Sequence, residues 1–335
     1  MADTVKIPRQ KKNRKNAVLY KEMTVDMKRP KVMLIMLIVN LLLIPVTASF
    51  FLGITIAAFE SISYRVLAWY FIALVFSEAT LLAFITPAIT AGSISLEKER
   101  QTLDVLLTTR MTTWEIIKGK YLSDFLFLSL MVISTFPILS IVFIYGGLSL
   151  FQLLYVGLGL IVFIAFISCW GVFFSTLTKN TVLSVILTYL FILFYMAITI
   201  GIPFVLLGIV AGINDALYYD NVNFPMITTE HFINGDFLFL TGIFNPILTI
   251  FDIVGNAIGY NFGEESFAGM SLLCDSGLMG HFTEKNWLFK LYSPLSMIYM
   301  CLTSFIVLKI SALMLNPVKG KERKMVKKNG TGQKN

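Results

Sequence analysis

Six long apolar stretches limit what this chain can fold into more than any other feature of its sequence. A helix needs about 20 mostly apolar residues to span the hydrocarbon core of a bilayer, and each stretch is long enough to do so. They cover residues 33–58, 66–91, 121–145, 150–174, 181–211 and 291–315. Only 14% of all residues are charged, against roughly 25% in a typical soluble domain. The sequence therefore predicts an all-α polytopic membrane protein with six transmembrane helices.

The basic residues gather on one side of the predicted membrane. Lys and Arg concentrate in the short cytoplasmic segments of membrane proteins. Here they lie mainly in the tails 1–31 and 316–335 and in the segment 93–118 between the second and third spans. Both termini are therefore predicted to be cytoplasmic. The same distribution ascribes the net charge of +7 to orientation in a lipid bilayer, so nucleic acid is not an expected partner.

The transmembrane domain, residues 32–315, contains one long loop that is expected on the outer side. This loop covers residues 213–290 and is rich in Asp and Glu. Within it, residues 237–250 are apolar enough to enter lipid, but Asn245-Pro246 interrupts them. A single crossing there would carry the basic C-terminal tail outside, against the charge rule, so a re-entrant or interfacial helix pair is expected. A full hairpin, in which 237–258 spans and the chain has eight crossings, stays open.

The basic segment before the first span has a helical pattern of its own. Leu19, Met23 and Met27 recur at i, i+4 and i+8 among basic residues, as in an amphipathic helix that lies in the membrane interface. An ordinary positively charged flank explains the pattern equally well. Both interpretations of this segment stay open.

The residues needed for chemistry inside the membrane are missing. The chain has two histidines, and its three cysteines form no CxxC pair. The predicted spans hold no cluster of nucleophilic, acid–base or metal-binding groups. No Walker A sequence, G-x-x-x-x-G-K-[ST], occurs either. The chain is therefore not predicted to be an enzyme, to bind ATP or to hold a cofactor or metal.

The segment between the second and third spans, residues 93–118, is the most informative part of the sequence. Its leucines predict one face of a short helix and its polar residues the opposite face. The leucines are Leu96, Leu103, Leu106 and Leu107, and the polar residues are Glu97, Gln101, Asp104 and Thr108. Ser93 or Ser95 is expected to cap this helix. Thr112 and Glu115 form a capping box, which predicts a break around 108–111 and a new helix leading into the third span.

Such a helix between two spans has two physical interpretations. Four or five polar residues would suffice to join the spans, so a capped, two-faced helix indicates a docking element for another protein. A structural elbow that rests on the lipid interface would show the same pattern. Periodicity alone leaves both open.

The residues from Thr86 to Leu122 resemble the corresponding segment of ABC-2-type transporter permeases. In that family the second span is followed by a consensus close to I-S-x-E-R/K-E-x-G-T-L-[DE]-x-L-L-x-T-P, and then E-[IL]-x-x-G-K. This chain has Ile94-Ser95-Leu96-Glu97-Lys98-Glu99-Arg100-Gln101-Thr102-Leu103-Asp104, Leu106-Leu107-Thr108-Thr109, Glu115-Ile116 and Gly119-Lys120. Gln101 stands where the family usually has Gly, and Arg110 stands where Pro is common.

This resemblance implies a membrane permease subunit of an ATP-binding cassette exporter in the plasma membrane of a prokaryote. Such a subunit works as a dimer with a second, identical or related permease and two separate ATPase subunits, which bind ATP and Mg. The segment Ile94 to Leu107 would be the coupling helix that docks on the ATPase. The implied contact residues are Glu97, Glu99, Arg100, Thr102, Leu103, Leu106 and Leu107.

Glu78 lies at the middle of the second predicted span, where a charged side chain costs a few kcal/mol or more. It either lines a translocation path or makes a hydrogen-bonded contact between helices. A secondary transporter or channel that uses Glu78 for ion coupling is one alternative function, although such proteins often have two related halves and residues 33–175 and 181–315 show no convincing repeat. A signalling or immunity module of the same ABC type, without net transport, is another alternative. No feature of the sequence selects a substrate.

Overall fold

The computed structural model describes residues 30–56, 64–108, 111–144, 149–223, 240–258 and 291–315, which contain helices and no strand. Five helices are long and apolar enough to cross a membrane, so the chain is an all-helical, multi-pass membrane protein. These are α3 (Tyr64–Thr90), α6 (Thr113–Ile144), α7 (Leu150–Leu177), α8 (Thr181–Asn223) and α13 (Tyr292–Met314). Their positions agree with five of the six predicted spans.

The first predicted span, 33–58, falls on α2 (Pro30–Ile56). The apolar part of α2 runs from Met33 to Ser49, which is shorter than the apolar part of the other five helices and too short to count among the candidate spans. Asn40 lies within it and donates a hydrogen bond from Nδ2 to Ser134 Oγ of α6 at 3.0 Å. The predicted amphipathic helix before α2, both basic tails and most of the 213–290 loop lie outside the described residues.

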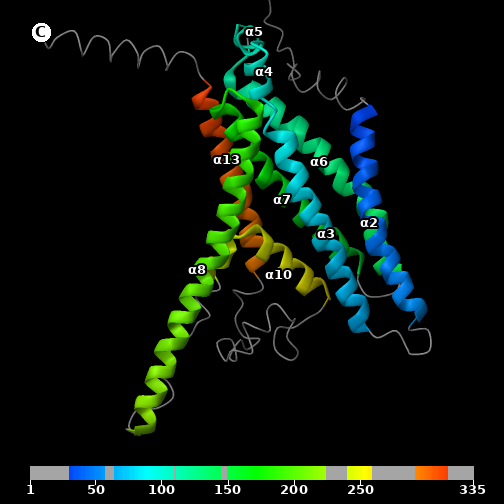
Figure 1. Ribbon diagram of the computed structural model, residues 1–335, viewed down its shortest axis with the longest axis vertical. Helices are drawn as coiled ribbons and strands as arrows, with labels where there is room; N and C mark the ends of the chain where they lie inside the picture. The colour runs from blue at the N-terminus through cyan, green and yellow to red at the C-terminus, as the bar shows by residue number, and fades with distance from the viewer. Residues whose placement is uncertain are drawn as a thin grey trace, which may run out of the picture.

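Helix α7 occupies the centre of the bundle, with α3, α6, α8 and α13 packed around it (Figure 1). Its buried residues are distributed along its whole length, because helices cover it on several sides. Two glycines permit these close contacts: a Cβ at Gly171 would overlap the Thr90 side chain of α3, and a Cβ at Gly157 would overlap the Phe136 ring of α6. The core of the bundle therefore forms around this one helix.

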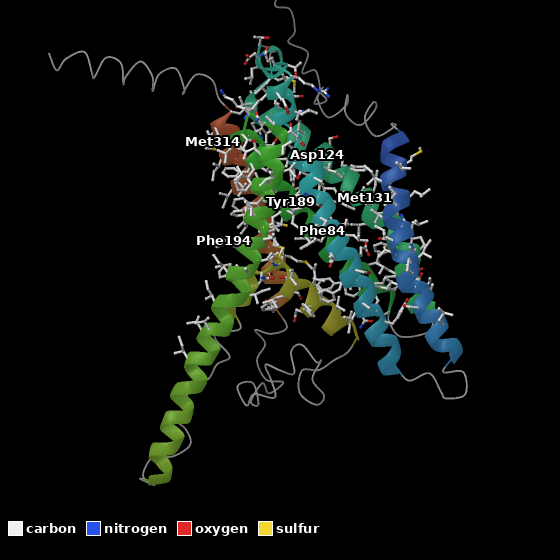
Figure 2. The ribbon with its side chains drawn as sticks, in the orientation of Figure 1. Phe84, Asp124, Met131, Tyr189, Phe194 and Met314 are labelled. Atoms are coloured by element: carbon white, nitrogen blue, oxygen red, sulfur yellow. The ribbon has the colours of Figure 1, made fainter. Side chains whose placement is uncertain are left out.

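Helix α8 packs against the bundle at its beginning and leans away from it further along (Figure 1). Near its start, Tyr189 donates a hydrogen bond from its hydroxyl to the backbone carbonyl of Phe84 in α3, and Figure 2 labels both residues. Farther along, the side chain of Phe194 is 68% exposed. On a membrane-spanning helix, such an exposed apolar side chain marks a surface that faces lipid or another subunit.

The apolar part of the 213–290 loop forms two short helices, η3 (Leu240–Phe244) and α10 (Pro246–Ile258). Thirteen residues of α-helix extend only about 20 Å, so α10 by itself is too short to span. Asn245 stands between the two helices, where its Oδ1 accepts hydrogen bonds from the amides of Ile247 and Leu248 at 2.8 and 3.1 Å. Its Nδ2 also donates to Thr199 Oγ1 of α8 at 2.7 Å. The predicted interruption at Asn245-Pro246 is therefore a capped helix start.

Candidate functional site

The segment between α3 and α6 contains two short helices, where the sequence pattern predicted one amphipathic helix, which the family resemblance implies at Ile94 to Leu107. These are α4 (Ser95–Glu99) and α5 (Leu103–Leu107). They lie at one end of the bundle, opposite to α10 (Figure 1), and we call this end the α4 end. The pattern was misleading because one residue with a non-helical backbone conformation can divide a helix without changing the spacing of the apolar residues.

Gln101 is the residue that ends α4. Its φ is 57°, the only positive value of any non-glycine residue in the described part of the chain. The amide of Thr102 donates to the Glu97 carbonyl at 2.9 Å, and the amide of Gln101 donates to the Lys98 carbonyl at 3.1 Å. Together these bonds form a Schellman motif, in which the left-handed position is usually Gly. A glycine-type backbone conformation thus occurs at the position where the resembled consensus has Gly.

The start of α4 is capped by another helix. The backbone amides of Ile94 and Ser95 both donate to Ser175 Oγ of α7 at 2.8 Å. The prediction that Ser93 or Ser95 caps this helix is wrong, since α4 has no side-chain cap of its own. Ser95 Oγ instead donates to the Ala91 carbonyl at 2.8 Å, and Ser93 Oγ donates to the carboxylate of Asp124 in α6.

Lys98 returns a cap to the end of α7. The last carbonyls of a helix lack partners within the helix, and basic side chains nearby satisfy them. Lys98 Nζ donates to the carbonyl of Thr176 and, at 3.2 Å, to that of Thr178. Burial lowers the pKa of Lys98, with repulsion from Lys179 as a second cause. Helices α4 and α7 therefore cap each other.

Glu99 contacts the start of the next helix, α8. Its carboxylate accepts hydrogen bonds from Thr181 Oγ1 at 2.7 Å and from the Thr181 amide at 3.3 Å. Both bonds lower the pKa of Glu99, and the bond from the Thr181 hydroxyl has the larger effect. Anionic groups are favoured at a helix N-terminus, where free amides and the helix dipole present positive charge. Glu99 is exposed to solvent yet engaged within the chain.

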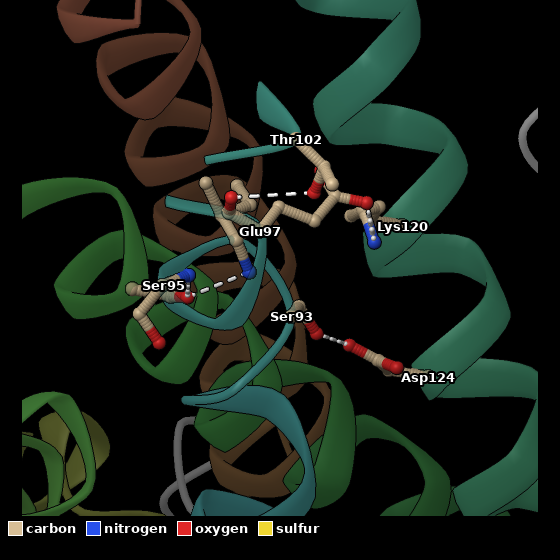
Figure 3. Close-up of polar contacts among 8 residues, drawn as sticks. Ser93, Ser95, Glu97, Thr102, Lys120 and Asp124 are labelled. Atoms are coloured by element: carbon tan, nitrogen blue, oxygen red, sulfur yellow. Dashed lines mark hydrogen bonds and ion pairs between the residues drawn. The ribbon is translucent and has the colours of Figure 1, made fainter. Parts of the chain in front are cut away.

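Glu97 connects α4 to α6. Its carboxylate forms an ion pair with Lys120 Nζ at 2.8 Å, and both side chains are largely or partly buried. Figure 3 shows this pair beside the contact between Ser93 and Asp124. We call the contacts of residues 93–99 with α6, α7 and α8 the α4 junction; their partner residues are Lys120, Asp124, Ser175, Thr176, Thr178 and Thr181.

The leucines predicted to share one face lie in different environments, because the break at Gln101 turns α5 relative to α4. Leu96 of α4 is 40% exposed, whereas Leu103 of α5 is buried in an apolar cluster with Ile117 of α6 and Val172 of α7. Leu106 and Leu107 are half-buried against the same cluster. Further members of the cluster come from α13 and the residue after it, namely Val307, Leu308, Ala312 and Leu315.

The exposed residues of this segment form a surface on the outside of the bundle. The residues are Leu96, Glu99, Arg100, Gln101, Thr102, Asp104 and Thr108. Of the seven predicted contact residues, Glu99, Arg100 and Thr102 belong to this surface. Glu97 is half-buried and engaged with Lys120, and Leu103 is buried.

The predicted start of the next helix is confirmed. Helix α6 begins at Thr113, directly after the predicted break. The amide of Thr112 donates to Glu115 Oε2 at 2.9 Å, and the amide of Glu115 donates to Thr112 Oγ1 at 3.2 Å. These are the two reciprocal bonds of a capping box. The signal was reliable because all of its atoms lie within four consecutive residues.

Sequence reasoning missed Ser175, Lys98 and Thr181 as members of the junction. Their hydrogen bonds join residues between 77 and 82 positions apart, which no local pattern reveals. One available signal was the short polar stretch from Thr178 to Asn180 between two apolar helices. This stretch indicates that the turn between α7 and α8 lies at the same end of the bundle as the connection between α3 and α6.

Glu78 is buried between α3 and α6, with only 1% of its surface exposed. The hydroxyl of Thr135 contacts the Glu78 carboxyl and also lies 2.7 Å from the Val132 carbonyl. The Thr135 hydroxyl donates to Glu78 Oε1, and it shares its one hydrogen with the Val132 carbonyl. Glu78 therefore forms a buried hydrogen-bonded contact between α3 and α6.

The rest of the described chain offers no second site of this kind. Among those residues, no group of three or more His, Cys, Asp or Glu side chains could hold a metal ion. No protein-family model matches the sequence, and comparison with curated proteins gives no match. Functional interpretation therefore rests on the α4 end of the bundle and on the residues that form it.

Proposed function

We propose that this chain is the membrane permease subunit of an ABC exporter, driven by separate ATPase subunits that dock on the α4–α5 segment. The observation that carries the proposal is the fold of residues 94–107. A helix of five residues has little stability by itself, yet α4 is held by side chains from three other helices and leaves a polar surface exposed. An elbow that only rests on lipid requires neither feature.

The backbone at Gln101 gives additional support. The resemblance to ABC-2-type permeases places a Gly at this position, and the left-handed conformation there is the one that Gly adopts most readily. The chain thus follows the expected backbone despite the different residue. This agreement does not depend on the hydropathy pattern from which the spans were predicted.

The proposed docking surface is the exposed set Leu96, Arg100, Gln101, Thr102, Asp104 and Thr108. Arg100 and Asp104 would orient the ATPase, and Leu96 would enter an apolar groove on it. Leu106 and Leu107 border this surface from a half-buried position. Glu97, Glu99 and Leu103 would act from within the chain, because they hold α4 and α5 in place.

The proposal includes the wider architecture of the complex. The permease would have six spans, with α2 as the first, and both termini would be cytoplasmic. Helices η3 and α10 would form a re-entrant element on the outer side. The permease would pair with a second permease subunit and two ATPase subunits, which bind ATP and Mg, in the plasma membrane of a prokaryote. The exposed apolar residues of α8 and α13 suit contact with lipid and with the second permease.

The test is co-purification with an ABC-type ATPase encoded beside this gene. Both proteins would be co-expressed, and the chain would carry Arg100→Glu together with Asp104→Arg. We expect a loss of at least about tenfold in recovered ATPase, since like charges that face each other across an interface weaken binding strongly. Lys118→Glu is the matched control, because Lys118 is exposed on α6 outside the docking surface. Equal recovery with all three forms of the chain would refute docking at this surface.

The alternative of a secondary transporter or channel rests on Glu78. One observation favours it: among the described residues, the second carboxyl oxygen of Glu78 is buried without a hydrogen-bond partner. If Glu78 exchanges a proton or cation during transport, Glu78→Gln abolishes transport in a folded protein. If the chain is an ABC permease, this variant retains ATP-dependent activity. A signalling or immunity module would bind the same ATPase but move no solute into sealed vesicles.

A further inference from the structure

We propose that Lys98 and Glu99 join α4 to the turn between α7 and α8, so that α4 and the adjoining ends of these two helices move as one body. Lys98, Glu99, Ser175 and Thr181 would be positioning residues for this motion. The rigid body is inferred from contacts alone. Its use in transport rests on the proposed function.

The first support is that the contacts run in both directions. Ser175 of α7 accepts the two amides at the start of α4, and Lys98 of α4 donates to the carbonyls at the end of α7. Each helix end thus supplies hydrogen-bond partners for backbone groups that have none within the other helix. A displacement of α4 by itself would leave unpaired amides at one place and unpaired carbonyls at the other, which is costly for buried backbone groups.

The second support is the short connection between α7 and α8. Only three residues, Thr178, Lys179 and Asn180, separate the two helices. Lys98 contacts the carbonyl of Thr178 before this turn, and Glu99 contacts Thr181 after it. Two consecutive residues of α4 therefore hold both sides of the turn, so neither side can shift without the other.

The third support is that α4 is also attached to α6. The ion pair between Glu97 and Lys120 and the hydrogen bond from Ser93 to Asp124 complete the attachment (Figure 3). A force applied to the exposed surface of α4 and α5 would consequently act on α7 and α8 as well as on the two helices that flank the segment in sequence. Motion of α8 would follow from its contact with Glu99, a residue about 80 positions earlier in the sequence.

Hydrogen–deuterium exchange of the purified full chain in lipid nanodiscs tests the rigid body without any ATPase. The readout is the exchange rate of the Ile94 and Ser95 amides. Ser175→Ala removes their acceptor and should raise this rate about tenfold. Lys98→Met and Thr181→Val remove contacts on the other side of α4, and each should raise the same rate about threefold if α4 is held as one body.

Two further variants complete this experiment. Arg100→Ala changes an exposed neighbour on the same turn and should leave the exchange of Ile94 and Ser95 unchanged. Glu99→Gln keeps an acceptor for Thr181 and should behave almost like the natural chain, which separates loss of the contact from loss of folding. Unchanged exchange in both Lys98→Met and Thr181→Val, or in Ser175→Ala, would overturn the proposal.

A second measurement addresses the link to transport. In the complex with its ATPase, Lys98→Met and Thr181→Val should keep co-purification but lower the stimulation of ATP hydrolysis by the permease at least about threefold. Stimulation equal to that of the natural chain would overturn the role in coupling. If no ATPase binds the natural chain, the proposed function fails, while the exchange experiment still decides whether α4, α7 and α8 form one body.

Discussion

Gln101 is a residue whose backbone suits glycine better than glutamine. A side chain in the left-handed conformation costs roughly 1–2 kcal/mol, and a β-branched side chain costs more. The Schellman bonds from Thr102 and Gln101 keep the chain in this conformation all the same. The residue therefore marks a position where backbone hydrogen bonds at the helix end overrule the conformational preference of the side chain.

Replacing Gln101 by Gly should maintain or slightly raise thermal stability. Relief of the left-handed strain and the greater freedom of Gly in the unfolded chain oppose each other, at about 1 kcal/mol each. Gln101→Val should lower the stability by about 2 kcal/mol. Thermal unfolding of the two variants in the same detergent checks this. A more stable Val variant would contradict the assigned backbone conformation.

Glu78 allows a second prediction at this scale. Glu78→Gln should fold normally, because its amide oxygen can accept from Thr135 Oγ1 as the carboxyl does. Glu78→Ala should lower the free energy of unfolding by roughly 1–3 kcal/mol, since it removes the partner of a buried hydroxyl. Thermal unfolding in detergent measures both effects. Equal destabilisation of the Gln and Ala variants would contradict a stabilising hydrogen bond between Thr135 and residue 78.

At the scale of elements, α7 determines how closely its neighbours can approach. Two of its glycines leave no room for a side chain: Gly171 lies against Thr90, and Gly157 lies against Phe136. The backbone of Ala91 would also be only 3.3 Å from a Cβ at Gly171. Helix α3 must shift its backbone if residue 171 has a side chain.

We therefore expect Gly171→Val to destabilise the bundle by at least about 1–3 kcal/mol. The matched control is Gly201→Val in α8, because among the described residues no atom beyond its chain neighbours and its own helix backbone lies within 4 Å of a Cβ at Gly201. Both changes introduce the same β-branched residue into a helix, so their difference isolates the contact with α3. Retention of folded protein after size-exclusion chromatography and the unfolding temperature would report it. Equal behaviour of the two variants would argue against the close approach of α3 and α7.

The elements themselves could largely be predicted from the sequence. Spans predicted at 66–91 and 291–315 correspond to α3 and α13 within two residues, because apolar length alone determines such helices. The capping box at Thr112 was equally predictable, since its atoms are local. The division into α4 and α5 and the contacts of Lys98 and Glu99 were not predictable, because they depend on residues of α7 and α8 that are distant in sequence.

At the scale of the whole molecule, the bundle has two chemically different ends. The α4 end contains Lys98, Lys120 and Arg100 and joins several helices through polar contacts. The α10 end is joined through η3 and α10, where Asn245 bonds to α8 and Ser296 of α13 donates to the Ile243 carbonyl at 2.6 Å. We expect the α4 end to be cytoplasmic, as in the proposed topology, because Lys and Arg concentrate on the cytoplasmic side of membrane proteins.

Cysteine labelling in intact cells checks this orientation. Cys169, Cys274 and Cys301 would first be replaced by Ala, and single cysteines would then be introduced as Arg100→Cys and Glu264→Cys. A membrane-impermeant maleimide should label residue 264 in intact cells and residue 100 only after permeabilisation. Labelling of residue 100 from outside would invert the proposed topology and remove the ATPase from the α4 end.

The reciprocal caps between α4 and α7 also set an order for biosynthesis. Residues 93–99 leave the ribosome before Ser175, Thr176 and Thr181, which lie 78–82 positions later in the hydrogen bonds that hold α4. At about 5–20 residues per second, the nascent segment waits roughly 4–16 s for these partners. During that interval α4 lacks its caps, so a chain truncated before Thr181 presents no finished docking surface. Recruitment of the proposed ATPase would thereby be restricted to chains in which α7 is complete and α8 has begun.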